Sequence, residues 1–250
     1  YDALGRVTSI ADGASGVVNL AYAASGELQE LSDQRELVTG FLYDGLGNLK
    51  QLTSPDTGIS RYRYDSAGNM IERTDARGRV AAYTYDALNR LLSIDYAVSG
   101  QSVRIIYDNW VLFGKPVCSA CNGLASLRID SSGHTLFDYS VRGEITSRHR
   151  AVEQLHFDTE FSYDKGGRLV RLVYPSGRIV DFARDALGRI KAVFTRQNAT
   201  SEGFNVVDDV RYRAFGPVKS FTHGNALRRV VDYDADGRVT GVRTDDTLHA

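Results

Sequence analysis

The chain has 250 residues, and its 30 lysines and arginines nearly balance 31 aspartates and glutamates, for a formal net charge of -1. This balance provides no long-range attraction to nucleic acid or anionic lipid, so we expect neither partner. With 42% hydrophobic and 24% charged residues the composition is that of a folded chain. No apolar run approaches the roughly 18 residues of a membrane-spanning helix, so no membrane anchor is predicted in this segment.

The sequence repeats itself every 21 residues. The opening heptapeptide, YDALGRV, has counterparts that begin at Tyr22, Tyr43, Tyr64 and Tyr85. Later copies begin at Tyr139, Tyr163, Arg184 and Tyr233, where Arg184 takes the position of the tyrosine. A fixed period of this kind indicates a repeat architecture. We therefore expect residues 1–250 to form a single continuous array, with no second domain.

Each repeat contains a turn signal. An aspartate followed three residues later by glycine is typical of a type I turn closed by a left-handed residue, the three-residue hairpin loop with its bulge. In one copy, Asn89 replaces the glycine that should follow Asp86. Asparagine is the non-glycine residue that best tolerates a left-handed backbone, so this copy is expected to form the same turn.

A second set of turn signals lies halfway between these turns, as at Asp75–Gly78, so each repeat is predicted to contain two strands and two turns. Between the turns, residues alternate with a period of two, and Ala81, Tyr83 and Tyr85 fall on one face. No convincing amphipathic helix is present. We therefore predict an all-β fold of repeated antiparallel hairpins, about 21 residues each, that form a coiled sheet because strand twist accumulates.

The pattern Tyr-Asp-x-x-Gly-Arg-Leu/Val at this spacing resembles the YD-repeat, or rearrangement hotspot (Rhs), family. The phrases YPSGR at 174–178 and THGN at 222–225 are similar to bacterial members rather than to the animal teneurins. The resemblance covers nearly the whole chain. It implies a sheet wound as a spiral into part of a hollow shell, which in bacterial polymorphic toxins and insecticidal Tc toxins encloses a toxic C-terminal domain.

The resemblance further implies a non-catalytic shell or scaffold segment, secreted or associated with the bacterial cell surface. Its expected partners are an enclosed toxin or effector domain of the same polypeptide, secretion-apparatus proteins and cell-surface glycans. The family's self-cleavage phrase, Asp-Pro-x-Gly, does not occur in this chain. Because Tyr1 opens a repeat and the last copy ends without a polar cap, we expect a fragment of a much larger protein.

A second hypothesis is a surface module that binds carbohydrate or mediates adhesion through exposed tyrosines and aspartates. Aromatic rings suit sugar rings, but the alternating pattern already gives the tyrosines a packing role. Saturable, tyrosine-dependent glycan binding would discriminate this hypothesis from encapsulation.

The register of the repeat breaks in residues 107–126, which we interpret as an irregular loop or an insertion. Cys118 and Cys121 lie there with the C-x-x-C spacing of redox and zinc sites. A tetrahedral zinc site needs four ligands and the chain has no second cysteine pair, so a local disulfide or two free thiols is the preferred interpretation.

The remaining candidate site residues are better interpreted as structural residues of the repeats. The run that begins at Asp232 mimics a calcium loop, but Arg243 stands where such a loop needs a glutamate. Arg61 and Arg63 are predicted to lie on a strand face opposite the tyrosines. No ligand or triad spacing is found among the five histidines, His134, His149, His156, His223 and His249. We predict no catalytic residue, no cofactor and no metal site.

Overall fold

The computed structural model describes residues 1–13, 16–97, 101–108, 111–112, 115–116, 118, 120–214 and 216–246. These residues form strands and turns, and 21 of the strands belong to one antiparallel sheet, which confirms the predicted all-β fold. Within the same ranges there is no helix of the length and apolar character that crossing a membrane requires. Contacts divide the chain into two compact units, residues 1–106 with 128–131 and residues 107–127 with 132–250.

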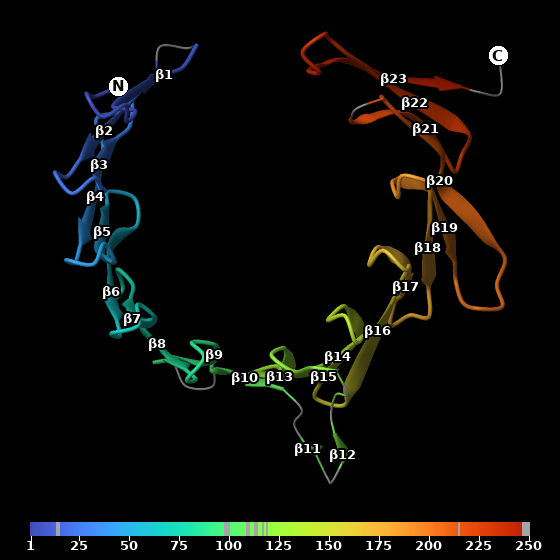
Figure 1. The fold of residues 1–250 in the computed structure, drawn as a ribbon, viewed down its shortest axis with the longest axis horizontal. Coiled ribbons are helices and arrows are strands. Elements are labelled where there is room, and N and C mark those ends of the chain that lie inside the picture. The colour runs from blue at the N-terminus through green and yellow to red at the C-terminus, as the bar shows by residue number, and fades with distance from the viewer. Residues whose placement is uncertain are drawn as a thin grey trace. The chain divides into compact units, whose positions relative to one another are not determined.

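The first unit is an antiparallel meander in which each strand pairs with the next (Figure 1). Its strands are β1 (Ser9–Ala11), β2 (Val17–Tyr22), β3 (Leu28–Ser32), β4 (Val38–Tyr43), β5 (Leu49–Ser54), β6 (Gly58–Tyr64), β7 (Met70–Thr74), β8 (Val80–Tyr85), β9 (Leu91–Tyr96) and β10 (Val103–Tyr107). Four consecutive repeats therefore supply the hairpins β2–β3, β4–β5, β6–β7 and β8–β9.

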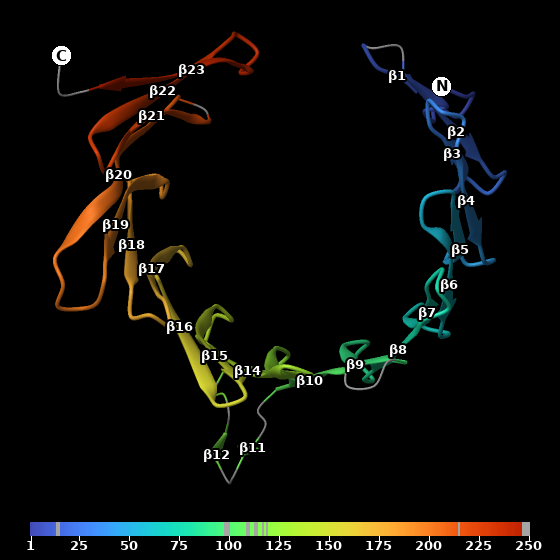
Figure 2. The ribbon, with the colours of Figure 1, turned by 180° about the vertical axis from the view of Figure 1, so that it is seen from behind.

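The second unit repeats this arrangement from β14 to β23 (Figure 2). Its strands are β14 (Gly133–Tyr139), β15 (Ile145–Val152), β16 (Leu155–Tyr163), β17 (Leu169–Val173), β18 (Ile179–Arg184), β19 (Ile190–Arg196), β20 (Gly203–Tyr212), β21 (Val218–His223), β22 (Leu227–Tyr233) and β23 (Val239–Asp246). The remaining strands are β11 (Val111–Leu112), β12 (Lys115–Pro116) and β13 (Ala125–Asp130).

The irregular stretch predicted at 107–126 falls partly outside the described residues. Within it, β11 and β12 pair with each other as a separate two-stranded ribbon. The interpretation of this stretch as an insertion, and of residues 1–250 as one array, stays a prediction.

The predicted three-residue hairpin loops are confirmed. In the turn that joins β4 and β5, the amide of Asp44 donates to the carbonyl of Asn48, and the amide of Gly47 donates to the carbonyl of Asp44. Gly47 has φ 81°, in the left-handed region. Asn89 occupies the same position with φ 59°, as its side chain predicted. A β-bulge lies at the tyrosine just before the turn. Tyr43, for example, pairs with Leu49.

One left-handed residue was not expected. Glu36 ends the turn that begins at Asp33 and has φ 59°. Asp33 compensates because its carboxylate accepts the amides of Arg35 and Leu37, at 2.8 and 3.0 Å. The turn therefore forms although the left-handed conformation is unfavourable for Glu36.

The cross-strand register gives the sheet two different faces, because residues paired across strands point to the same side. One side, called here the tyrosine face, carries pairs such as Phe41 with Leu52 and Tyr83 with Ile94. The other side, called the polar face, carries pairs such as Arg63 with Glu72, whose ion pair measures 2.9 Å. The predicted separation of Arg63 from the tyrosines is therefore observed.

Neither unit has a second layer packed on its sheet, since the strong contacts among the described strands join sequence neighbours. The apolar side chains of the tyrosine face, such as Leu20, Phe41 and Leu52, are consequently only half-buried. Buried apolar side chains are few among the described residues, and Leu127 and Ile179 are examples. Cross-strand packing, rather than an enclosed core, stabilises this fold.

The turn geometry yields a matched pair of substitutions within one loop. Gly47→Ala places a Cβ on a left-handed residue and is expected to destabilise the β4–β5 hairpin by about 1 to 2 kcal/mol. Gly45→Ala lies in the same loop, has open space around the new Cβ and no left-handed backbone, so it should be neutral or slightly stabilising. Hydrogen exchange of the β4–β5 amides measures the effect of each substitution on the stability of the hairpin. Equal loss of protection in the two variants would contradict the assigned turn.

Candidate functional site

In most repeats an aspartate opens the turn and folds its side chain back over it. Asp86 is representative: its Oδ1 accepts the amides of Leu88 and Arg90, both at 2.9 Å. Its Oδ2 accepts the Arg90 Nε at 2.7 Å. The same carboxylate-to-arginine contact closes turns at Asp2 with Arg6, Asp75 with Arg79, Asp164 with Arg168 and Asp185 with Arg189. The side chain therefore satisfies backbone donors and fixes the arginine at the edge of the sheet.

Neighbouring repeats are joined by the tyrosine hydroxyl. Tyr85 Oη donates to the carbonyl of Met70 at 2.9 Å, and Met70 is the residue that follows the preceding turn. The hydroxyl of Tyr22 makes the equivalent bond to Val7 at 2.9 Å. The guanidinium of Arg6 also stacks on the Tyr22 ring, 4.5 Å from its centroid. Tyr22 thus binds both the backbone and the arginine of the repeat before it.

Arg184, which stands in the tyrosine position, makes a substitute for this link. Its Nη2 donates to the carbonyl of Leu169 at 2.8 Å, the position equivalent to Met70. Its Nη1 donates to the carbonyl of Gly188 at 3.0 Å. The buried Nε of Arg184 has no partner among the described residues, so this link is less complete than a tyrosine's. The contact between repeats, rather than the aromatic ring, is what this position preserves.

These contacts shift the pKa values of both residue types. The amide and guanidinium of Arg90 hold the pKa of Asp86 below its ordinary value, against an opposing effect of burial. For Asp44, the side-chain amide of Asn48 has the largest effect and also lowers the pKa. Burial raises the pKa of Tyr85, as it does for Tyr64. The turns are therefore held by ionised carboxylates and neutral phenols.

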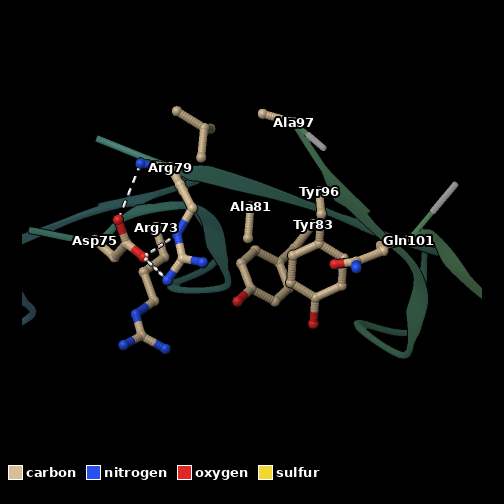
Figure 3. Close-up of a pocket in the computed structure, with 9 residues that line it drawn as sticks. Arg73, Asp75, Arg79, Ala81, Tyr83, Tyr96, Ala97 and Gln101 are labelled. Carbon is tan, nitrogen blue, oxygen red and sulfur yellow. Dashed lines mark hydrogen bonds and ion pairs between the residues drawn. The ribbon is translucent and has the colours of Figure 1, made fainter. Parts of the chain in front are cut away.

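The tyrosine face of the first unit contains a cleft of about 320 Å³, called here the tyrosine cleft. Tyr83 and Tyr96 line it, and Gln101 lies at its border (Figure 3). Asp75 and Arg79 contribute an ion pair of 2.7 Å on the opposite side. The cleft also contains the exposed Arg73, which has no carboxylate partner among the described residues. Aromatic rings beside several hydrogen-bonding groups suit a polar, ring-shaped ligand.

Three residues that looked unrelated in the sequence form a hydrogen-bonded chain on the polar face of β15 and β16. Ser147 Oγ lies 3.0 Å from His149 Nε2, and His149 Nδ1 lies 3.0 Å from Asp158 Oδ1. Ser147 also donates to Asp138 Oδ2 at 2.8 Å. The His149 and Asp158 side chains are 43% and 60% exposed. A hydroxyl that donates to a carboxylate on an open strand favours a solvated polar network over a nucleophile.

Cys118 and Cys121 are both buried and present as free thiols, one of the two arrangements left open by the sequence. Cys121 Sγ donates to the carbonyl of Asp108 at 3.1 Å. Burial, with the neighbouring Cys118, raises the pKa of Cys121 to about 12. A thiol with such a pKa is a poor nucleophile and a poor metal ligand at neutral pH.

The calcium-like run is arranged as a hairpin. Arg243 Nη1 forms an ion pair of 2.8 Å with Asp232, the first residue of the run. Asp234 instead accepts the amide of Arg238 at 2.8 Å, as the aspartate of a repeat turn does. Among the described residues, no group of three or more histidine, cysteine, aspartate or glutamate side chains is arranged to hold a metal ion.

The fold and the links between repeats define a class of protein, a β-hairpin repeat array in which each unit is bound to the previous one. Residues 43–80 and 64–102 match the family model described as the RHS repeat. No curated protein sequence is significantly similar to the chain.

Solved structures extend the likeness to almost the whole chain. The crystal structure of TcdB2-TccC3 without its hypervariable C-terminal region has a TM-score of 0.76 at 17% identity, over 94% of this chain and 13% of that chain. TcdB2-TccC3 itself has a TM-score of 0.76 at 18% identity, over 93% of this chain and 13% of that chain. A Tc holotoxin pore from Photorhabdus luminescens has a TM-score of 0.76 at 18% identity, over 93% of this chain and 12% of that chain. Residues 43–102 thus match the RHS repeat, and the chain has the fold of these Tc toxin structures.

The ionised turns predict a dependence of stability on pH. A carboxylate whose pKa is lowered by folding stabilises the fold above its ordinary pKa of 3.8, and this stabilisation is lost as pH falls through the lowered value. Protection factors of the β8–β9 amides should therefore be steady from pH 5 to 7 and fall below about pH 4. In Asp86→Asn, which keeps an acceptor but not the charge, the fall should be smaller. Unchanged protection of the original hairpin at pH 3 would exclude this role.

Proposed function

We propose that this segment is part of the wall of a shell that encloses a toxin or effector domain of the same polypeptide. The observation that carries the proposal is that the described strands form a repeat sheet without a second layer, and that its apolar tyrosine face is half-exposed in both units. An uncovered apolar face requires another surface against it. The fold shared with TcdB2-TccC3, a protein whose solved forms include one lacking a hypervariable C-terminal region, supports the same interpretation.

In this proposal the segment is a scaffold and carries no catalytic activity of its own. The repeat residues that would be candidates for chemistry are occupied by structural tasks, as the carboxylate of Asp86 is by its own turn. The polypeptide would be exported from a bacterium with its enclosed domain, in keeping with the likeness to a holotoxin. Because the chain spans about an eighth of the chains it matches, the identity of the enclosed domain lies outside it.

Protease protection tests this function in the complete reading frame that contains the chain. The domain that follows the repeats should survive limited proteolysis at least tenfold longer than the same domain expressed alone. Replacing three turn glycines together, Gly47→Val, Gly68→Val and Gly188→Val, should open the wall and abolish the protection. Gly45→Ala is the matched control. A domain digested at the same rate in both contexts would rule out enclosure.

A second candidate function, recognition of saccharides, is favoured by the tyrosine cleft. Its two aromatic rings offer apolar surfaces, while Arg73 and Gln101 supply hydrogen-bond donors around them.

A glycan array probed with the chain tests this candidate. If a saccharide binds in the tyrosine cleft, Tyr83→Ala and Tyr96→Ala should each weaken the binding at least tenfold. Tyr174→Ala, which removes a similarly exposed tyrosine of the second unit, should leave it unchanged. Absence of any saturable binding, or equal loss in all three variants, would reject the candidate.

A further inference from the structure

The loop between β19 and β20, residues 197–202, carries a short pattern that the repeat architecture does not explain. Asn198, Ala199 and Thr200 have the form Asn-x-Thr, with a residue other than proline in the middle. This is the acceptor pattern for attachment of a sugar to an asparagine side chain. Of the nine asparagines in the sequence, only Asn198 has serine or threonine two positions later. Because so short a pattern arises easily by chance, accessibility and geometry must decide whether it is an acceptor.

The loop is accessible. It lies at the free end of the β19–β20 hairpin, drawn in orange in Figure 1, and Arg196 with Gly203 forms the last cross-strand pair before it. Asn198, Ala199 and Thr200 are all exposed. An enzyme that modifies an asparagine must surround its side chain, which a loop outside the sheet allows and a paired strand does not.

The amide oxygen of Asn198 is held by three donors. Its Oδ1 accepts the hydroxyl of Thr200 at 3.0 Å, the backbone amide of Thr200 at 3.0 Å and the backbone amide of Ser201 at 2.9 Å. The bond to the backbone of Thr200 makes the loop an Asx turn. Hydrogen bonds to this oxygen stabilise negative charge on the amide, so its nitrogen releases a proton more readily. The hydroxyl at the third position of the pattern thus has a defined task.

The amide nitrogen of Asn198 is available, unlike those of other asparagines in the chain. Asn48 and Asn69 each donate to the aspartate of their own turn at 3.0 Å. Asn205, in the adjoining strand β20, donates to Asp208 at 2.8 Å. Asn198 Nδ2 donates to no group of the described residues, while its oxygen is fully occupied. The side chain therefore presents the atom to which a sugar is attached.

From this geometry we propose that Asn198 is N-glycosylated in the complete protein. The donor is a sugar whose C1 carries a diphosphate linked to a nucleoside or to a lipid, and the partner is a glycosyltransferase of the producing cell. Nδ2 forms a bond to C1 while the bond from C1 to the diphosphate oxygen breaks, and the diphosphate leaves with the electron pair. One Nδ2 proton passes to a base of the transferase. Attachment requires that the loop stay uncovered, whether or not the shell encloses another domain.

Mass spectrometry of the complete protein, purified from the organism that makes it, tests the proposal. Trypsin cleaves after Arg196 and Arg211, so one peptide contains Asn198 together with Asn205, which lacks the pattern and is the internal control. Electron-transfer fragmentation leaves a sugar on its residue. We expect a sugar on Asn198 and none on Asn205. A single sugar unit indicates the nucleoside-linked donor, and an oligosaccharide indicates the lipid-linked donor. Asn198 without any sugar would overturn the proposal.

Variants produced in the same organism test the part played by the hydroxyl. Thr200→Ala removes the donor to Asn198 and should abolish the modification, whereas Thr200→Ser keeps a hydroxyl and should retain it. Ser201→Ala is the matched control, because only its backbone amide bonds to Asn198, and it should be modified like the original. All three positions lie outside the strands, so thermal unfolding should be unchanged. Full modification of Thr200→Ala would overturn the proposal, and so would equal loss in all three variants.

Discussion

The carboxylate that accepts amides of its own turn is the interaction on which the rest of the fold depends. It converts a flexible connection into a hairpin with a fixed bulge, as Asp86 does for β8 and β9. A lone hairpin is marginally stable in water, so the hairpins must also be linked to one another. The tyrosine hydroxyl provides that link, because Tyr85 binds the backbone that follows the previous turn. Stability is therefore a sum over repeats and over the contacts between neighbours.

A protein built in this way has two free faces and few residues in an enclosed core. The tyrosine face keeps its apolar side chains against one another within one layer, while the polar face carries ion pairs such as Arg63 with Glu72. This economy suits a wall, because the wall can lengthen by whole repeats without changing its cross-section. An arginine can replace the tyrosine at position 184 because its guanidinium keeps the hydrogen bond to the carbonyl of Leu169.

The turns could be predicted from the sequence because each depends on a few neighbouring residues. The groups of side chains on the sheet could not, because they depend on the register between strands. The loop at Asp44–Gly47 and the left-handed Asn89 followed from residue types alone, because a turn is decided within four or five residues. The left-handed Glu36 did not, since nothing in its side chain favours that conformation. The grouping of Ser147, His149 and Asp158, and the position of Arg148 and Arg150 on the opposite face, depend on which residues face each other across β14 to β16. The sequence pattern specifies this pairing only once each bulge has been counted.

The bulges also connect the turns to the two faces of the sheet. Because side chains alternate, Ser147 and His149 point to the polar face and Arg148 and Arg150 to the tyrosine face. A shift of one residue would exchange the two pairs and place both arginines among the carboxylates of the polar face. Asp138 pairs with Ser147 and Tyr139 with Ile145, so Thr146 is the extra residue of a bulge, and this bulge sets the register at the start of β15. The chemistry of a turn at the edge of the sheet thus determines which charges its faces present, and a change in a turn can alter a strand face that it does not touch.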